Sequence, residues 1–304
     1  MKLLKYIIPF TLLCLSAIVH ADIKVFATVP EWGALAEALG GDKVSVYVAT
    51  SGMQDPHRIQ ARPSLIAKAR GANLIIATGA ELEAGWLPVV QRESNNPVVM
   101  PGQAGFFEAS AYVKMLNVPA AVDRSMGDVH AAGNPHIQTD PRNLVAIGKA
   151  LSTRMEQLDP ENGAYYRARG EQFQKTWQSN LARWQKDAAP LRGIKVWYQH
   201  DGYPYMNQWL NLVQVGILEP VPGVDPSGKQ LSDILQRQQS LQGRMVITSA
   251  YMNDAPSRWF SEKAGIPEVT LPFTVGGNEQ VKNLANLYDD TLARLLAALK
   301  ANNR

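Results

Sequence analysis

Two series of short valine- and isoleucine-rich runs, each interleaved with helix-like stretches, are the feature that most restricts the fold. The first series comprises residues 23–29, 44–50, 74–78 and 98–100, and the second comprises 194–198, 213–218, 245–249 and 269–271. Helix-like stretches include residues 32–39, 63–70 and 280–300. Strands that are apolar throughout and alternate with helices form parallel sheets covered on both faces. The chain is therefore predicted to be α/β, with two lobes, each a mostly parallel sheet flanked by helices.

A long helix is predicted between the two series. Asp159-Pro160-Glu161 is typical of a helix start, with a capping side chain, a proline and an acid in the first turn. Large apolar side chains then recur at helical spacing on one face, at Tyr166, Phe173, Trp177, Leu181 and Trp184. About 28 residues at 1.5 Å each span about 42 Å. Such a stripe is typical of packing, so we expect a spine helix over 156–190 that links an N-terminal lobe, 22–155, to a C-terminal lobe, 191–304.

The N-terminus resembles a secretory signal. Lys2 and Lys5 precede an apolar run over residues 6–19, which is followed by a cleavage-like ending at Ala21. The run contains Pro9 and is shorter than the ~20 residues that a membrane span needs. We therefore predict a cleavable signal peptide over residues 1–21.

The only cysteine, Cys14, lies inside this apolar run and follows Leu13 rather than a small residue, which argues against a lipid-modified N-terminus. A mature chain without cysteine has no disulfides and must bind any metal through nitrogen or oxygen. Removing the signal lowers the formal charge by two, from +3 to +1. The basic residues are dispersed, so no nucleic-acid surface is predicted.

The mature sequence contains only four histidines: His57, His130, His136 and His200. Each lies in a loop-like segment next to proline, glycine or aspartate. Imidazole is the commonest metal ligand, and ligands of open α/β sheets bind at the carboxyl ends of the strands. His130 and His136 share one turn-rich loop, so both are candidates for one ion, or His136 alone with His130 at the entrance. The pattern predicts a metal site in the cleft between the lobes.

Several further segments occur in a specific order along nearly the whole mature chain. They are Asp55-Pro56-His57 with Arg62-Pro63-Ser64, Gly79-Ala80-Glu81-Leu82-Glu83 with Trp86-Leu87, Asn134-Pro135-His136 with Asp140-Pro141, His200-Asp201-Gly202-Tyr203, Gly216-Ile217-Leu218-Glu219-Pro220 and Val224-Asp225-Pro226-Ser227-Gly228. In this order they resemble the periplasmic receptors of ABC-type zinc and manganese importers, the cluster A-I solute-binding proteins. The resemblance implies two lobes joined by one long helix, metal held by His57, His136 and His200, a periplasmic location, and delivery to an inner-membrane ABC permease.

The chain departs from this family at the fourth ligand. Many relatives supply a carboxylate from a segment near the end, whereas residues 270–274 here contain no acid. The fourth position is left to water, to Glu81 or Glu83, or to His130. Zinc relatives also often carry a long loop rich in histidine and acid, but residues 118–133 offer only Asp123, Asp128 and His130. An auxiliary metal-gathering loop is therefore not expected.

Ligand chemistry predicts the metal. Three imidazoles with at most one oxygen suit tetrahedral Zn²⁺, whereas Mn²⁺ prefers more carboxylates. We therefore expect Zn(II) as the transported ligand. The protein is also expected to be a monomer. Near the site, Glu219 is expected to make structural hydrogen bonds, and Asp201 either to orient His200 or to be solvated.

Two alternatives remain open from the residues alone. In a zinc hydrolase, Glu81 or Glu83 would act as a general base, but the chain has no His-Glu-x-x-His helix and no Gly-x-Ser-x-Gly motif. A receptor for a larger metal chelate would need a roomy aromatic pocket. The candidate lining residues are Trp32, Trp86, Tyr203, Tyr205 and Trp259.

Overall fold

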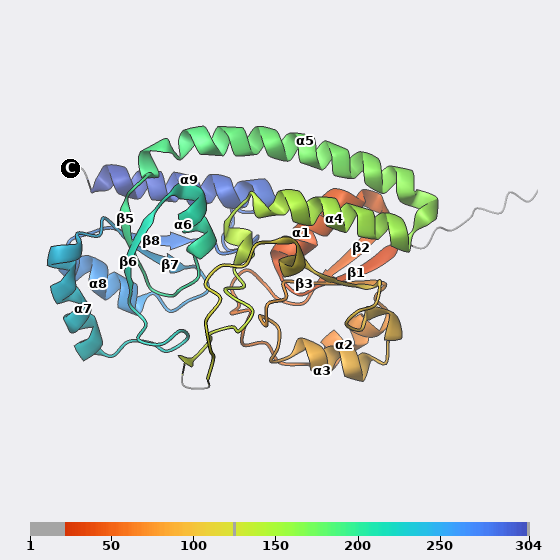
Figure 1. The fold of residues 1–304 in the computed structure, drawn as a ribbon, viewed down its shortest axis with the longest axis horizontal. Helices are drawn as coiled ribbons and strands as arrows, with labels where there is room; N and C mark the ends of the chain where they lie inside the picture. The colour runs from red at the N-terminus through yellow and green to blue at the C-terminus, as the bar shows by residue number, and fades with distance from the viewer. Residues whose placement is uncertain (1–21, 124–125, 303–304) are drawn as a thin grey trace, which may run out of the picture.

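The chain forms two parallel four-stranded sheets in a computed structural model that describes residues 22–123 and 126–302 (Figure 1). The first sheet contains β1 (Ile23–Ala27), β2 (Val44–Val48), β3 (Leu74–Ala77) and β4 (Phe106–Glu108), in the order β2-β1-β3-β4. The second contains β5 (Lys195–Tyr198), β6 (Val213–Ile217), β7 (Val246–Ser249) and β8 (Glu268–Leu271), in the order β6-β5-β7-β8. All strand pairs within the sheets are parallel. The predicted α/β class with two parallel sheets is confirmed, and the predicted signal peptide lies outside the described residues.

One predicted strand is wrong. Residues 98–100 do not pair with the sheet, because Pro97–Val99 forms a short 3-10 helix capped by the side chain of Asn96. Pro97 has no N–H to donate to a strand ladder. The valine content of this run reflects the burial of Val99 in a core, and the fourth strand is Phe106–Glu108 instead. The other seven predicted strands each overlap an observed one.

The helices cover both sheets and mostly begin at a proline in the first turn, where a missing N–H does no harm. They are α1 (Pro30–Gly40), α2 (Pro63–Arg70), α3 (Leu87–Ser94), α4 (Asn143–Leu158), α5 (Gly163–Asp187), α6 (Pro204–Leu210), α7 (Gly228–Leu241), α8 (Ala255–Ala264) and α9 (Leu284–Ala301). Within residues 22–123 and 126–302, no helix combines the length and the apolar character that crossing a bilayer requires.

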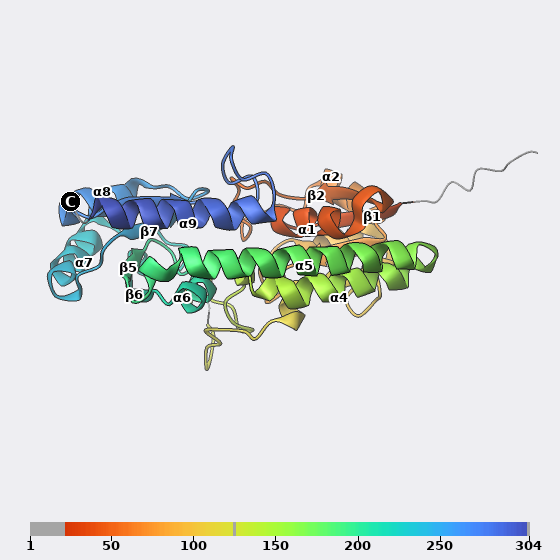
Figure 2. The same cartoon turned by 90° about the horizontal axis from the view of Figure 1, so that it is seen from above.

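The long helix α5 runs past both sheets, with α4 beside its first half and α9 beside its second half (Figures 1 and 2). Its 25 residues span about 37 Å. The α-helix begins later than predicted, because Pro160–Asn162 first forms a 3-10 turn. The side chain of Asp159 does not cap the helix but accepts hydrogen bonds from Asn162 and from the hydroxyl of Tyr166.

The aromatic stripe of α5 packs as predicted. Tyr166, Trp177 and Trp184 are buried, and the rings of Trp177 and Trp184 contact Tyr288 of α9 with centroids 5.6 and 5.1 Å apart. Tyr288 in turn donates its hydroxyl to the carbonyl of Gln138. The helical layer is therefore one packed unit rather than a flexible linker.

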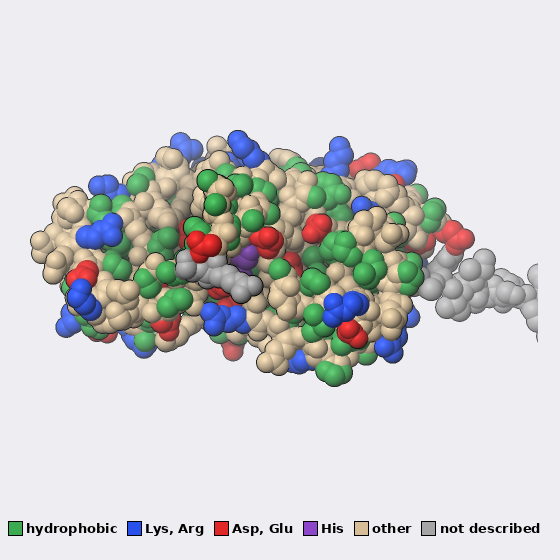
Figure 3. All heavy atoms as spheres, turned by 60° about the horizontal axis from the view of Figure 1, so that its bottom comes forward, with side chains coloured by type: hydrophobic (Ala, Val, Ile, Leu, Met, Phe, Trp, Pro, Cys, Tyr) green, Lys and Arg blue, Asp and Glu red, His purple; other side chains and the backbone are tan. Residues whose placement is uncertain are grey.

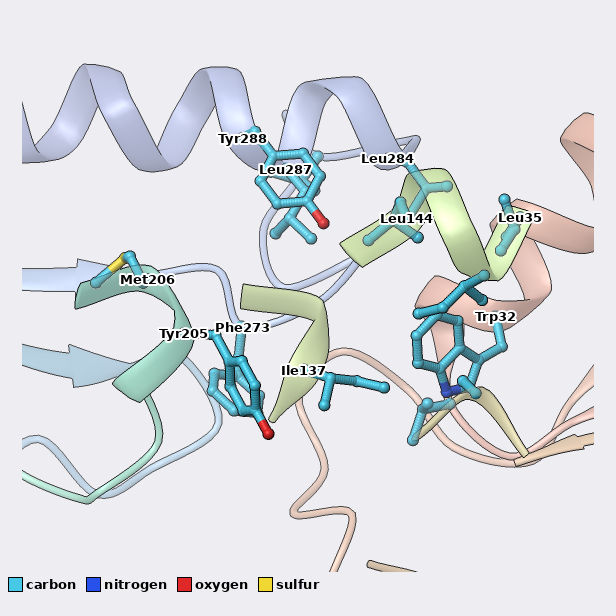
Figure 4. Close-up of a cluster of buried hydrophobic side chains, with 14 of the residues drawn as sticks. Trp32, Leu35, Ile137, Leu144, Tyr205, Met206, Phe273, Leu284, Leu287 and Tyr288 are labelled. Carbon is cyan, nitrogen blue, oxygen red and sulfur yellow. The ribbon is translucent and has the colours of Figure 1, made fainter. Parts of the chain in front are cut away.

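A single hydrophobic cluster extends across the two sheets. Figure 4 shows Trp32 and Leu35 of α1 on one side, Met206 and Phe273 on the other, and side chains of α4 and α9 between them. Close-packed interiors resist deformation. The two sheets thus share a core, and large hinge motions would have to break it.

Gly52, after β2, makes a backbone contact with Gly276, after β8. A Cβ at Gly52 would lie 2.4 Å from the carbonyl carbon of Gly276. We expect Gly52→Ala to lower the free energy of unfolding by about 1–3 kcal/mol, as overpacking does, measured by urea unfolding of the metal-free protein. Gly71→Ala is the matched control, because a Cβ there meets nothing within 4 Å. Equal effects of the two substitutions would contradict the contact.

Candidate metal site

The four histidines that the sequence singles out meet between the two sheets. The ring centroid of His57 lies 5.3 Å from that of His130, 5.2 Å from that of His136 and 6.2 Å from that of His200. The centroids of His136 and His200 are 5.8 Å apart. Figure 3 shows histidine between the two halves of the molecule, flanked by acidic side chains.

The fold explains this convergence. His57 follows β2 and His200 follows β5, so both lie at the carboxyl ends of parallel strands, where such sheets bind ligands. His136 lies in the loop between β4 and α4, and its backbone N–H donates to the side chain of Asn134. The amide of Asn134 also donates to the carbonyl of Asp201, which anchors this loop to the second sheet.

Two of the rings are oriented by carboxylates. Nδ1 of His57 lies 2.9 Å from Oδ1 of Asp55, and Nδ1 of His200 lies 2.7 Å from Oε2 of Glu219. A carboxylate on one ring nitrogen fixes the ring and leaves the other nitrogen for a ligand. For both histidines, Nε2 is therefore the free nitrogen.

Several imidazole nitrogens are buried without a hydrogen-bond partner. Among the described residues, Nε2 of His57, Nε2 of His130 and Nδ1 of His136 have none. Native structures rarely leave buried polar atoms unpaired without a functional reason. The three rings lie close together, and buried nitrogens without partners are what a metal-binding site requires.

The electrostatics favour neutral rings at two positions. Burial, together with neighbouring His57, lowers the pKa of His130 to about 4 and holds the pKa of His136 well below its usual value. Burial also lowers the pKa of His200, but the hydrogen bond and charge of Glu219 outweigh this effect, so that the pKa is raised. Neutral imidazole is the form that ligates metal.

The spacing of the rings is slightly wider than coordination requires. Three imidazoles around a tetrahedral ion with bonds of about 2 Å place their ring centroids about 5 Å apart. The observed separations among His57, His136 and His200 range from 5.2 to 6.2 Å. As these side chains stand, no group of three or more His, Cys, Asp or Glu in the described part of the chain is positioned to hold an ion.

The two glutamates that were candidates for the fourth ligand are engaged elsewhere. Glu83 is buried and accepts hydrogen bonds on both oxygens, from Thr28, from the backbone of Thr78 and from Gly79. Glu81 accepts a hydrogen bond from the backbone N–H of Ala131, next to His130. Glu81 therefore anchors the segment 127–136 that carries His130 and His136, called the histidine loop below.

The cavity at the histidines is small. It measures about 50 Å³ and is lined by residues that include His130, His136 and His200. Pockets for drug-sized ligands measure about 300–1,000 Å³. Four of the five aromatic residues considered for a chelate pocket are buried in packing: Trp32, Trp86, Tyr203 and Tyr205 are at most 3% exposed. The fifth, Trp259 of α8, is half-buried and packs against the core of the second sheet. At the histidines, the described residues thus do not form the roomy pocket that a larger ligand needs.

Sequence reasoning missed the role of Asp55 and left that of Glu219 vague. Asp55 precedes His57 by two residues, a spacing that lets its carboxylate reach the His57 ring. This spacing could have predicted the contact from the sequence. Glu219, not the side chain of Asp201, bonds to the His200 ring. The segment without an acid, residues 270–274, contributes the ring of Phe273, whose centroid lies 4.9 Å from that of His136.

Comparisons with known proteins agree with this architecture. The family model of zinc-uptake complex component A, periplasmic (ZnuA), matches residues 25–301. The metal ABC transporter substrate-binding lipoprotein SloC of Streptococcus mutans is 20% identical over 246 residues, 78% of this chain and 76% of that protein. A crystal structure of ZnuA superposes with a TM-score of 0.77 at 19% identity, covering 91% of this chain and 99% of that one. The Pseudomonas aeruginosa protein FpvC in complex with Mn²⁺ gives 0.76 at 16% identity, covering 92% and 99%.

The fold and the family match define an extracytoplasmic metal-binding receptor of an ABC importer, whose partners are a divalent transition-metal ion and the transporter components. More particularly, the chain belongs to the ZnuA family, within the cluster A-I solute-binding proteins of zinc and manganese importers. The resemblance inferred from the sequence is confirmed. The protein is a transport receptor and not an enzyme, as expected.

A buried carboxyl group links the two sheets near the site. Glu31, in the first turn of α1, accepts a hydrogen bond of 2.5 Å from the hydroxyl of Thr274, which follows β8. Burial raises the pKa of Glu31 to about 7, despite the opposing effect of the Thr274 hydrogen bond. Nearby Glu83 adds to the rise.

This pKa predicts a pH-dependent stability. The folded state retains the Glu31 proton up to about pH 7, whereas the unfolded chain loses it near pH 4.5. The contribution of Glu31 to stability is therefore complete below pH 4.5 and falls as the pH rises to about 7, by about 3 kcal/mol. Glu31→Gln should remove this fall, so that the variant gains stability relative to the wild type between pH 5 and pH 8 in urea unfolding.

The exposed Glu37 on the same helix provides the matched control. Glu37→Gln should leave the pH profile of the wild-type protein unchanged. A Glu31→Gln profile parallel to that of the wild type would show that the carboxyl does not hold its proton in the fold.

Proposed function

We propose that this protein captures one Zn²⁺ between the two sheets through His57, His136 and His200, and delivers it to the permease of an ABC importer. The observation that carries the proposal is the set of buried imidazole nitrogens without partners. Nε2 of His57 and Nδ1 of His136 have none, and Glu219 occupies Nδ1 of His200, which leaves Nε2 as the nitrogen of that ring able to bind a metal. Imidazole lone pairs left free in this way are zinc ligands.

The chemistry of the surrounding acids supports zinc over manganese. Asp55 and Glu219 bond to ring nitrogens and therefore orient ligands rather than serve as ligands. An all-imidazole set suits Zn²⁺, whereas Mn²⁺ favours carboxylate oxygens. Zinc should accordingly displace manganese in competition, although the Mn²⁺ complex of FpvC makes manganese the necessary competitor.

We propose His130 as an accessory group at the fourth position. Its ring stacks on that of His57, and its Nε2 is buried without a partner. Glu81 holds the loop that carries it through the N–H of Ala131. Water is the alternative occupant of that position.

The sequence supports the cellular setting of this proposal. A cleavable signal peptide at residues 1–21 would deliver a monomeric receptor to the periplasm. The division into an N-terminal lobe (22–155), a spine (156–190) and a C-terminal lobe (191–304) is part of the same proposal. Deletion of the gene should slow growth in zinc-poor medium, with rescue by the wild-type protein and not by His136→Ala.

Native mass spectrometry of the mature protein tests the ligand set. We expect one zinc per chain, and its loss in His57→Ala, His136→Ala and His200→Ala, because each substitution removes one of the three proposed primary ligands. His130→Ala is the matched control and should retain one zinc. A wild-type protein that binds no zinc near neutral pH would refute the proposal.

The orienting role of Glu219 makes a second prediction. Loss of a carboxylate that orients a metal-binding histidine typically weakens affinity by about 10–100-fold. Glu219→Gln should therefore lower zinc affinity within this range in a chelator competition assay. Asp201→Asn is the control and should change affinity much less, because its side chain does not bond to the ring. The reverse ranking would assign the orienting role to Asp201.

A further inference from the structure

Arg58, the residue after His57, contacts three segments at the mouth of the cleft. Its side chain is 64% exposed. Nε of Arg58 lies 3.5 Å from Oδ2 of Asp55, and the same carboxylate holds Nδ1 of His57 through its other oxygen. Arg58 is therefore one residue removed, through Asp55, from a ring of the candidate site.

On the opposite side of the cleft, Arg58 reaches the second half of the chain. Its Nη2 donates to the carbonyl oxygen of Gly223 at 2.8 Å. The N–H of Gly223 donates to Oε2 of Glu219 at 2.8 Å, and that oxygen also accepts from Nδ1 of His200. The peptide groups flanking Gly223 thus relay a contact from Arg58 to a second ring of the candidate site.

The contact between Arg58 and Glu219 depends on glycine at position 223. Its φ is +81°, which favours glycine. A Cβ there would lie 2.1 Å from Oδ2 of Asp128, which itself stands 3.9 Å from Nη2 of Arg58. The backbone of Asp128 also donates to the carbonyl of Pro222. The histidine loop, the segment after β2 and the segment after β6 therefore meet at one point.

We propose that Arg58 is a positioning residue that clamps the two halves of the chain and slows metal release. An ion pair from Asp55 to Arg58, followed by hydrogen bonds from Arg58 to Gly223 and from Gly223 to Glu219, joins the two carboxylates that orient His57 and His200. A local opening at this point of the cleft, which leaves the shared core intact, breaks the Arg58–Gly223 bond and frees both carboxylates to move. The inference rests on the proposed zinc site, but the clamp itself exists without metal.

A positioning role for Arg58 can be distinguished from a purely structural one by its effects on stability and on the rate of metal release. Arg58 is exposed, so its removal leaves no cavity and should lower the midpoint of urea unfolding only slightly, by no more than the loss of its hydrogen bond to Gly223 accounts for. A clamp acts after binding, so its loss should raise the rate of metal release and leave the rate of association unchanged. Raising the salt concentration should bring wild-type release toward that of the variant, because exposed charges are screened.

The first test uses the metal-free protein. Amide hydrogen exchange over residues 219–224 should be about fivefold faster in Arg58→Ala than in the wild type, as expected for loss of one exposed charged hydrogen bond. Arg62→Ala, a substitution at an exposed arginine four residues further along, is the matched control and should match the wild type. Unchanged exchange in Arg58→Ala would overturn the clamp, whatever the protein binds.

The second test measures zinc release to an excess of chelator by stopped flow. Release should be about fivefold faster in Arg58→Ala and unchanged in Arg62→Ala. Faster exchange with an unchanged release rate would overturn the link between the clamp and the metal. Faster exchange in a protein that binds no zinc would support the clamp and refute the proposed function instead.

Discussion

The packing of α5 and α9 on each other, on α1 beside the first sheet and, for α9, on β8 of the second sheet is the constraint on which the rest of the structure depends. Trp177 and Trp184 of α5 meet Tyr288 of α9, and the hydroxyl of Tyr288 bonds to the carbonyl of Gln138 just beyond His136. The helical layer thus fixes the distance between the sheets and also the loop that carries one of the histidines. The relative position of the two walls of the cleft is therefore set by packing in the core behind them, and not by contacts across the cleft.

Within this frame, the candidate site resembles many metal centres in that the carboxylates lie behind the imidazoles. Asp55 and Glu219 each fix one ring and add negative charge next to it. Burial lowers the pKa of both His136 and His200, but at His200 the hydrogen bond and charge of Glu219 outweigh it, so that the two rings end with opposite shifts. The site is therefore organised by its outer hydrogen bonds before any ion arrives.

Much of this arrangement follows from sequence patterns with a local cause. The β-branched runs predict seven of the eight strands, and the helix-spaced aromatics predict the long helix. Residues 98–100 mislead because Val99 is buried without being in a strand, a distinction that hydrophobicity does not carry. The start of α5 is displaced because Asp159 bonds to Tyr166 rather than capping the helix.

The candidate site also contains features that the sequence predicts and features that it does not. The four histidines could be grouped because strand direction places their loops at the carboxyl ends of the strands in the two sheets. The partners of Glu83, and the Thr274 hydroxyl that meets Glu31, could not be foreseen, because they join residues brought together only by tertiary packing. The contact of Arg58 with Gly223 is of this kind as well, since it links positions 165 residues apart.

The position of α9 has a consequence for the order in which the chain acquires its structure. Residues 284–301 complete a core that also contains Trp32 and Leu35 of α1, near the other end of the described chain. A chain emerging on the far side of a membrane would keep that apolar surface uncovered until its last helix had crossed. Long-range closure of this kind slows folding and leaves partly emerged chains prone to aggregation. Export chaperones and rapid completion of transfer therefore bear directly on the yield of this receptor.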